Sequence, residues 1–281
     1  MEKPEGRVEP RKALYLYCIY KGEPALSAGP GIDGTTPTFT LRHRDLCGLV
    51  SYFFLDESNE GILNKKVDNP KWLIPRAKRH EEIVRFVAGF YPVTPIKFGN
   101  LFTGDEAVLE FLRNSYEPLC SFLEFVRDKE EWGLKVYADQ EHVRSAAVGT
   151  SRLVRQFDHE CCCSASGEAY LRRKKRQEVA QQEEARLLGT LANDVYQKVL
   201  SWSVEGRRNR PLGREATERS EEMILNGAFL VPKWEVAAFK QRIGGLGASH
   251  EANRLSFEIS GPWPPYNFCP ELAVHNGAAT A

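Results

Sequence analysis

The sequence predicts two α+β domains with mostly antiparallel sheets, and three observations lead to this fold class. Apolar segments typical of strands alternate with segments of helical periodicity along the whole chain. The C-terminal half follows the order strand, long helix, short strand or hairpin, helix, strand, which is the split βαββαβ plan of ferredoxin-like domains. The length of 281 residues exceeds that of an average domain. We therefore expect an N-terminal α+β domain over residues 1–128, a C-terminal ferredoxin-like domain over residues 129–270 and a disordered tail over residues 271–281.

Two strands and a loop open the first domain. Residues 13–20 are rich in Tyr, Leu and Ile and predict a strand. Residues 22–38 contain many Gly, Pro, Ser and Thr residues and predict a flexible loop or insertion. Residues 49–55 are continuously apolar around Ser51 and Tyr52 and predict a second, well-buried strand.

A helix over residues 75–88 follows, with Pro75 at its first position and Gly89 as its stop. Its apolar positions recur at helical spacing and predict one buried face, formed by His80, Ile83, Val84 and Val87. Because His80 belongs to this face, we expect it to border the core rather than to act as a catalyst.

Residues 93–102 are apolar but irregular, and Pro95 places them at an edge or a bend. Lys97 in this stretch is either a buried switch or, as we favour, a solvated tip. Thr103 and Glu106 have the spacing of a capping box for the next helix. Pro118 falls within the apolar stripe of that helix, so we expect a kink or a break there.

The second domain begins with a strand over residues 132–137, and a long helix is expected over residues 168–202. The apolar stripe of this helix occupies only its second half, so its basic first half should project into solvent or onto a partner. Residues 222–231 predict a strand with a turn or bulge at Asn226-Gly227. A helix over residues 232–243, ended by Gly244-Gly245, and a strand over residues 255–260 complete the domain.

The closing segment, residues 261–268, reads Gly-Pro-Trp-Pro-Pro-Tyr-Asn-Phe. Its three prolines remove backbone donors and stiffen the chain, so no helix can continue and no central strand can pair there. The aromatic residues of the segment have two interpretations. They either fold back and seal their own domain, or they form an exposed recognition surface of rigid aromatic anchors.

Composition excludes several classes of function. Lys plus Arg and Asp plus Glu both number 38, which argues against non-specific binding of nucleic acid or of an acidic membrane by the whole chain. The N-terminal residues carry no apolar signal core, and no apolar run approaches the roughly 18 residues of a membrane span. Seven cysteines without an export signal predict reduced thiols in a cytoplasmic protein. Of these, Cys18, Cys47 and Cys120 are expected to be small core residues.

Motifs of common enzymes are missing from the sequence. It contains no phosphate-binding Gly-x-x-x-x-Gly-Lys-Ser/Thr loop, no Gly-x-Ser-x-Gly nucleophile elbow and no His-Glu-x-x-His pair. His159 and Cys161–Cys163 suggest a metal site, but three adjacent thiols cannot readily converge on one tetrahedral ion. We therefore expect an oxidation-prone loop at this position, no cofactor, and a protein that binds or assembles others.

Five stretches resemble a known family. The closing segment, residues 261–268, is similar to the signature of gas vesicle accessory proteins of the L/F family (GvpL/GvpF). Further stretches agree in order and spacing: Tyr15-Leu-Tyr17, His80 followed by residues 93–99 (Val-Thr-Pro-Ile-Lys-Phe-Gly), residues 166–171 (Ser-Gly-Glu-Ala-Tyr-Leu) and residues 226–231 (Asn-Gly-Ala-Phe-Leu-Val). The loop at residues 22–38 and the three adjacent cysteines depart from the pattern of the family.

The resemblance implies a function as well as a fold. It implies two ferredoxin-like α+β domains, the first of them modified, and a non-enzymatic role in building the shell of a buoyancy organelle. The implied partners are the small hydrophobic major shell protein and other gas vesicle accessory proteins, without nucleic acid or membrane. The implied location is the cytoplasm and the gas vesicle, including its gas-facing surface. As partner-binding residues we predict two groups, on an apolar edge of the first domain and on the closing segment: Pro95, Phe98, Trp263, Pro264, Pro265 and Tyr266.

Two other classes remain open at this point. A ligand-binding protein or enzyme of the α+β class would use a pocket between the domains, with His80 or Lys97 as its polar group. An RNA-binding ferredoxin-like module would need aromatic and basic residues together on an open sheet face.

Overall fold

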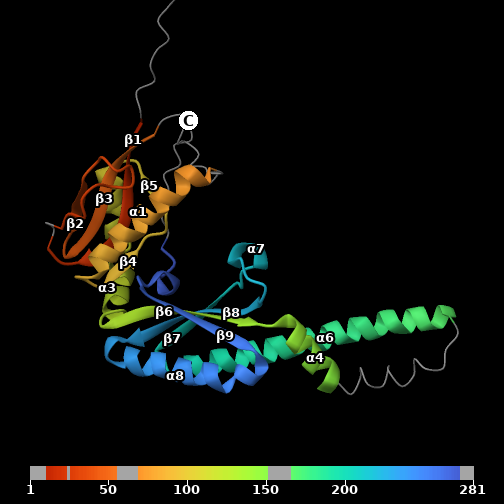
Figure 1. The fold of residues 1–281 in the computed structure, drawn as a ribbon. Coiled ribbons are helices and arrows are strands. Elements are labelled where there is room, and N and C mark those ends of the chain that lie inside the picture. The colour runs from red at the N-terminus through yellow and green to blue at the C-terminus, as the bar shows by residue number, and fades with distance from the viewer. Residues whose placement is uncertain (1–10, 24–25, 56–68, 151–165, 273–281) are drawn as a thin grey trace, which may run out of the picture. The chain divides into compact units, whose positions relative to one another are not determined.

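The computed structural model describes residues 11–23, 26–55, 69–150 and 166–272, which form two compact units (Figure 1). The first unit contains residues 1–128 together with residues 263–281, and the second contains residues 129–262. The chain thus leaves the first unit at the position expected from the sequence. Residues 263–270, which the sequence pattern assigns to the second domain, group with the first unit instead, because Tyr266 packs against its core. Of the predicted tail, residues 273–281 lie outside the described residues.

The sheet of the first unit is centred on β1 (Arg11–Lys21). Strand β1 pairs antiparallel with β3 (Leu46–Leu55), and on its other side with β4 (Val93–Pro95) and β5 (Leu101–Phe102). Strand β2 (Thr38–His43) pairs with β3 at the edge, so the order is β2-β3-β1-β4.

Helices cover both faces of this sheet. Helix α1 (Pro70–Ala88) packs on one face, and α2 (Asp105–Asn114) and α3 (Tyr116–Phe125) pack on the other. Both faces of β1 are therefore buried: Tyr15 and Tyr17 contribute to the α1 side, whereas Leu14 and Leu16 contribute to the other. A register shift at Tyr17 lets the next residue, Cys18, join the same side as Tyr17, as a β-bulge does.

The α1 prediction was right about the buried face and wrong about the start. His80, Ile83, Val84 and Val87 are all buried, and the helix ends at Gly89 as predicted. It begins at Pro70 rather than at Pro75, because the Asn69 side chain accepts a hydrogen bond from the backbone N–H of Lys71 and caps the helix there (3.1 Å).

The capping box predicted for the next helix was also wrong. Gly104 occupies the cap position of α2, and no side chain bonds to the cap. The expected break occurs at Ser115, between α2 and α3, rather than at Pro118. Pro118 instead lies in the first turn of α3, where backbone N–H groups have no partner within the helix. The N–H that proline lacks is therefore not needed there.

The loop that precedes β2 carries its own hydrogen bonds. The Asp33 carboxylate accepts from the backbone N–H groups of Thr35 and Thr36 (2.9 and 3.0 Å). The buried hydroxyl of Tyr17 accepts from the N–H of Ile32 (2.8 Å). In its described part the loop is thus fixed to the sheet rather than flexible. It replaces the first helix of the ferredoxin-like plan, whose strand order the unit otherwise keeps.

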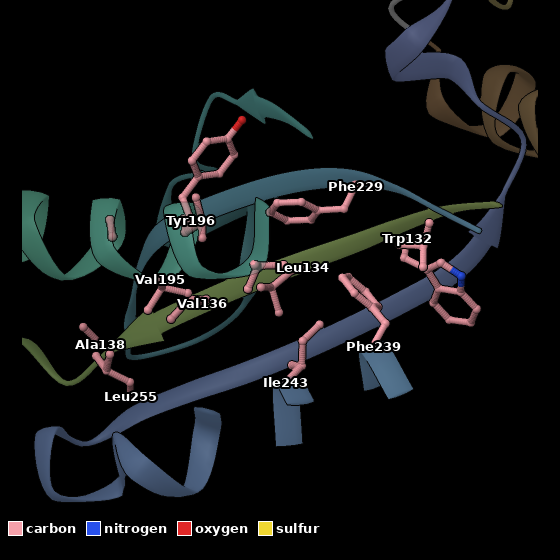
Figure 2. Close-up of a cluster of buried hydrophobic side chains, with 14 of the residues drawn as sticks. Trp132, Leu134, Val136, Ala138, Val195, Tyr196, Phe229, Phe239, Ile243 and Leu255 are labelled. Atoms are coloured by element: carbon pink, nitrogen blue, oxygen red, sulfur yellow. The ribbon is translucent and has the colours of Figure 1, made fainter. Parts of the chain in front are cut away.

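The second unit has that plan in full. Its sheet has the order β7-β8-β6-β9, formed by β6 (Lys129–Ala138), β7 (Glu205–Asn209), β8 (Glu222–Pro232) and β9 (Leu255–Trp263). Helices α6 (Ser166–Leu200) and α8 (Val236–Ser249) pack on one face of it, and Figure 2 shows the core that they enclose. The α+β class and the ferredoxin-like second domain are therefore confirmed.

Two boundaries in this unit differ from the prediction. Helix α8 continues through Gly244-Gly245 to Ser249. Strand β8 runs unbroken through Asn226-Gly227, and its register shift lies at Ile224 instead, opposite Val136 and Tyr137 of β6. Gly227 is required by packing, since a Cβ on it would lie 2.7 Å from the Phe229 ring, which fills the core beside it (Figure 2).

The long helix α6 is supported for part of its length by α4 (Gln140–Thr150), which packs against it. Ala180 and Glu184 are buried there, although the sequence predicted no apolar face in this half. The basic residues Arg173 and Lys174 remain exposed, as expected. A short helix, α7 (Arg214–Thr217), precedes β8. None of the helices in the described ranges has the length and apolar character needed to cross a bilayer.

Candidate functional site

The closing segment brings the end of the chain back to the first unit. It begins at Gly261, near the end of β9, where the backbone has a φ of +132°. A Cβ at this position would lie 2.9 Å from the carbonyl oxygen of Glu131, so only glycine fits without strain. Pro264 is buried, and a short turn, η5 (Tyr266–Phe268), follows. The aromatics of this segment thus fold inward on the first unit, with Trp263 as the exposed exception (37% exposed).

The anchor of the segment is a hydrogen-bonded row centred on His80. The hydroxyl of Tyr266 lies 3.2 Å from His80 Nε2, and the hydroxyl of Tyr15 lies 3.0 Å from His80 Nδ1. Because the Tyr15 oxygen already accepts from the N–H of Gly99 (3.1 Å), its own proton is available for Nδ1. The network therefore assigns the imidazole proton to Nε2, facing Tyr266.

Aromatic rings enclose this row. Tyr17 stacks on His80 with ring centroids 5.7 Å apart, and Phe98 meets His80 edge-on at 5.8 Å. Phe98 also packs on Tyr15 at 5.9 Å. Because His80 is only 3% exposed, we call Tyr15, Tyr17, His80, Phe98 and Tyr266 the aromatic cluster and treat it as part of the core.

Burial keeps every titratable member of the aromatic cluster uncharged at neutral pH. Burial lowers the pKa of His80 to about 4, and a hydrogen bond to the backbone of Ile96 offsets this only in part. Burial raises the pKa of Tyr17 to about 12 and raises the pKa values of Tyr15 and Tyr266 further. His80 thus has both ring nitrogens engaged and little access to a substrate, whereas Lys97, the alternative polar group for a pocket, is exposed.

The two predicted partner-binding surfaces lie together in the structure. Phe98 and Tyr266 both contact the core of the first unit, and the Cys269 sulfur lies 3.3 Å from the carbonyl oxygen of Pro265 and 3.6 Å from that of Pro95. The candidates differ in exposure: Pro95 and Pro264 are buried, Phe98, Pro265 and Tyr266 are half-buried, and Trp263 is exposed.

Sequence reasoning missed the cation that contacts Trp263 and the exposed aromatic residues near the end of α1. The Arg85 guanidinium lies 4.7 Å from the centroid of the Trp263 ring, a cation–π contact. Phe86, on the same turn of α1, is 43% exposed and stacks edge-on with Phe90, which is 64% exposed. The available signal was the four-residue spacing of the two phenylalanines, away from the apolar face of Ile83.

The remaining polar clusters of the described chain show no metal-binding arrangement of His, Cys, Asp and Glu. Cys161–Cys163 lie outside the described residues. On the second unit, Glu258 accepts from Lys135 (3.1 Å), Arg219 (3.0 Å) and the hydroxyl of Tyr137 (3.4 Å). Both basic groups and the Tyr137 hydroxyl on that sheet face are therefore bonded to Glu258, which leaves no open platform of the RNA-binding kind at these residues.

Comparison with known proteins places this geometry in a family. A family model described as "Gas vesicle synthesis protein GvpL/GvpF" matches residues 13–270. Gas vesicle protein L of Streptomyces sp. (strain CB03234) is 24% identical, with 90% of this chain and 91% of the relative covered. Gas vesicle protein F2 of Halobacterium salinarum is 23% identical, with 95% of each chain covered.

Solved structures share the fold. The crystal structure of gas vesicle protein GvpF from Anabaena sp. PCC7120 matches with a TM-score of 0.69 at 19% identity, covering 92% of this chain and 98% of that one. GvpF from Microcystis aeruginosa matches with a TM-score of 0.64 at 18% identity, covering 92% and 99%. The chain therefore belongs to the GvpL/GvpF family of gas vesicle synthesis proteins, which are involved in gas vesicle formation.

Proposed function

We propose that this protein is a non-enzymatic accessory protein that binds the hydrophobic major shell protein of the gas vesicle. In this role it nucleates or chaperones shell formation in the cytoplasm, together with other gas vesicle accessory proteins. If the contact with the shell protein persists after assembly, this protein stays in the vesicle as a minor component at the gas-facing surface. Membership of the GvpL/GvpF family supports a role in vesicle formation.

The physical reason for such a helper lies in its proposed client. A subunit that lines a dry gas space carries apolar surface, and this surface is exposed to water until the subunit is assembled. Apolar surface of that kind promotes aggregation unless another protein covers it. A folded protein that offers aromatic anchors can cover it and release it at the growing shell.

The observation that carries the proposal is the convergence of Phe98 with the closing segment, although the two are far apart in the sequence. The aromatic cluster fixes the backbone of the closing segment, and Trp263 remains partly exposed on Arg85. Phe86 in the last turn of α1 and Phe90, just after the end of that helix, contact each other and add two exposed aromatic rings. We call Phe86, Phe90 and Trp263 the aromatic surface and propose it as the contact for the shell protein, with Phe98 in the aromatic cluster that holds the closing segment.

The test is retention of the shell protein on immobilised full-length chain. Trp263→Ala and Phe98→Ala should each reduce retention, Trp263→Ala by removing an anchor and Phe98→Ala by loosening its support. Trp234→Ala is the matched control, because Trp234 is 74% exposed on the second unit. Folding is first checked by circular dichroism, since truncating a buried aromatic costs about 3–5 kcal/mol. Retention that is unchanged in both folded variants, or that falls equally in the control, would refute this assignment.

A further inference from the structure

The exposed face of α1 carries a row of cations that the aromatic surface does not explain. Lys71, Lys78 and Arg85 are all exposed and follow one another at seven-residue spacing. In an α-helix this spacing returns to nearly the same direction, with a drift of about 20° per step. The row therefore runs almost straight along the helix for about 21 Å, at about 1.5 Å per residue. We call these three residues the cationic row.

Among the residues that the structure describes, the cationic row has few ion-pair partners. Arg85 lies 3.4 Å from Glu81 and also contacts the Trp263 ring. Neither Lys71 nor Lys78 forms an ion pair with another described residue. The opposite face of the helix, at His80, Ile83, Val84 and Val87, is buried in the core of the unit, so the row cannot turn inward.

Apolar side chains border the cationic row. Ile74 is 63% exposed and lies one turn from both lysines, and Phe86 is 43% exposed beside Arg85. Cations on a line with exposed apolar residues on its flanks are complementary to an amphipathic helix with acidic residues at the same spacing. Such a helix would bury its apolar residues against Ile74 and Phe86 while its carboxylates face Lys71 and Lys78.

Other anionic partners fit this face less well. Glu82 is exposed between Lys78 and Arg85, and its carboxylate lies 3.4 Å from Arg79. A phosphate backbone following the row would meet this negative charge, whereas a helix can place an uncharged residue opposite it. The chain as a whole has no net positive charge to attract a polyanion.

We propose that the cationic row of α1 docks an amphipathic helix of another protein, one that carries acidic residues at seven-residue spacing next to an apolar stripe. This contact goes beyond the proposed function, because its partner is selected by acidic residues and need not be the shell protein; Phe86 is the residue that it shares with the aromatic surface. It gives the first unit a second interaction surface, chosen by charge as well as by apolar contact.

The experiment uses the full-length protein and two synthetic helical peptides of three heptads. One peptide has Glu at one position of each heptad beside a leucine stripe, and the other has Lys in place of each Glu. Binding is measured by fluorescence anisotropy at low and at moderate salt. The unaltered protein should bind the acidic peptide at least about tenfold more tightly than the basic one, and added salt should weaken that binding.

Variants make the assignment specific. Lys71→Glu with Lys78→Glu should reverse the preference in favour of the basic peptide. Lys174→Glu with Lys198→Glu, which changes the charge by the same amount on exposed positions of α6, should leave the preference unchanged. Equal binding of the two peptides, or a preference that survives Lys71→Glu with Lys78→Glu, would overturn the proposal. Displacement of the acidic peptide by duplex DNA would also overturn it, since the row would then be a nucleic-acid contact.

Discussion

Acid should destabilise the first unit through His80, because this histidine is folded in its neutral form. Burial lowers its pKa from the ordinary value of 6.5 to about 4. The unfolded chain therefore binds a proton at a higher pH than the folded one. The contribution of neutral His80 to the stability of the first unit is complete above pH 6.5 and is lost as the pH falls from 6.5 to 4.

The size of the effect follows from the two pKa values. Their difference corresponds to about 3 kcal/mol in total, at about 1.36 kcal/mol for each pKa unit. Between about pH 7.5 and about pH 5, roughly 2 kcal/mol of this stability should be lost. The groups that face His80 are the hydroxyls of Tyr15 and Tyr266, the Tyr17 ring and, beyond Tyr266, the Glu81 carboxylate.

The assay is urea unfolding at the two pH values, read separately for each unit by pulse-labelling hydrogen exchange on peptides from β1 and from β8. His80→Gln removes the titrating group, so the variant should lose roughly 2 kcal/mol less than the unaltered protein as the pH falls. His43→Gln, in the same unit, is the matched control and should retain the full loss. The reasoning would be refuted if His80→Gln showed the same acid-dependent loss in β1 as the unaltered protein.

Three further substitutions test the packing by urea unfolding. Tyr266→Phe should cost about 1–3 kcal/mol, because His80 Nε2 loses a buried partner, while Tyr170→Phe, on an exposed side chain, should cost almost nothing. Gly261→Ala should lower the free energy of unfolding by about 1–3 kcal/mol, because alanine at a φ of +132° is strained and its Cβ would approach the Glu131 carbonyl. The control is Gly213→Ala, where a Cβ would point into open space. Equal stabilities of the two variants would contradict the argument. Phe229→Ala should lower the free energy of unfolding of the second unit, read from β8 peptides, by about 3–5 kcal/mol. A decrease below about 1 kcal/mol would show that the core closes over the cavity.

Local periodicity predicted much of the fold. The spacing of His80, Ile83, Val84 and Val87 predicted the buried face of α1, because a helix that packs on a sheet needs one apolar stripe. The order of strands and helices in the second half predicted its ferredoxin-like topology for a similar reason. The spacing of apolar residues within each segment shows whether that segment is a helix or a strand. Helix boundaries were predicted less well, since the cap at Asn69 and the continuation of α8 past Gly244-Gly245 depend on hydrogen bonds and packing that periodicity does not encode.

For the candidate site, the sequence by itself determined the residue types: a stiff segment rich in proline and aromatic residues, and an apolar stretch around Phe98. Only the tertiary structure decided that these stretches meet at His80, and that Tyr266 turns inward while Trp263 stays partly exposed. The physical reason is that the contact joins positions 186 residues apart, so no local pattern reports it. Which side of a short, irregular segment is buried depends on the surface against which it folds, and here that surface belongs to the other end of the chain.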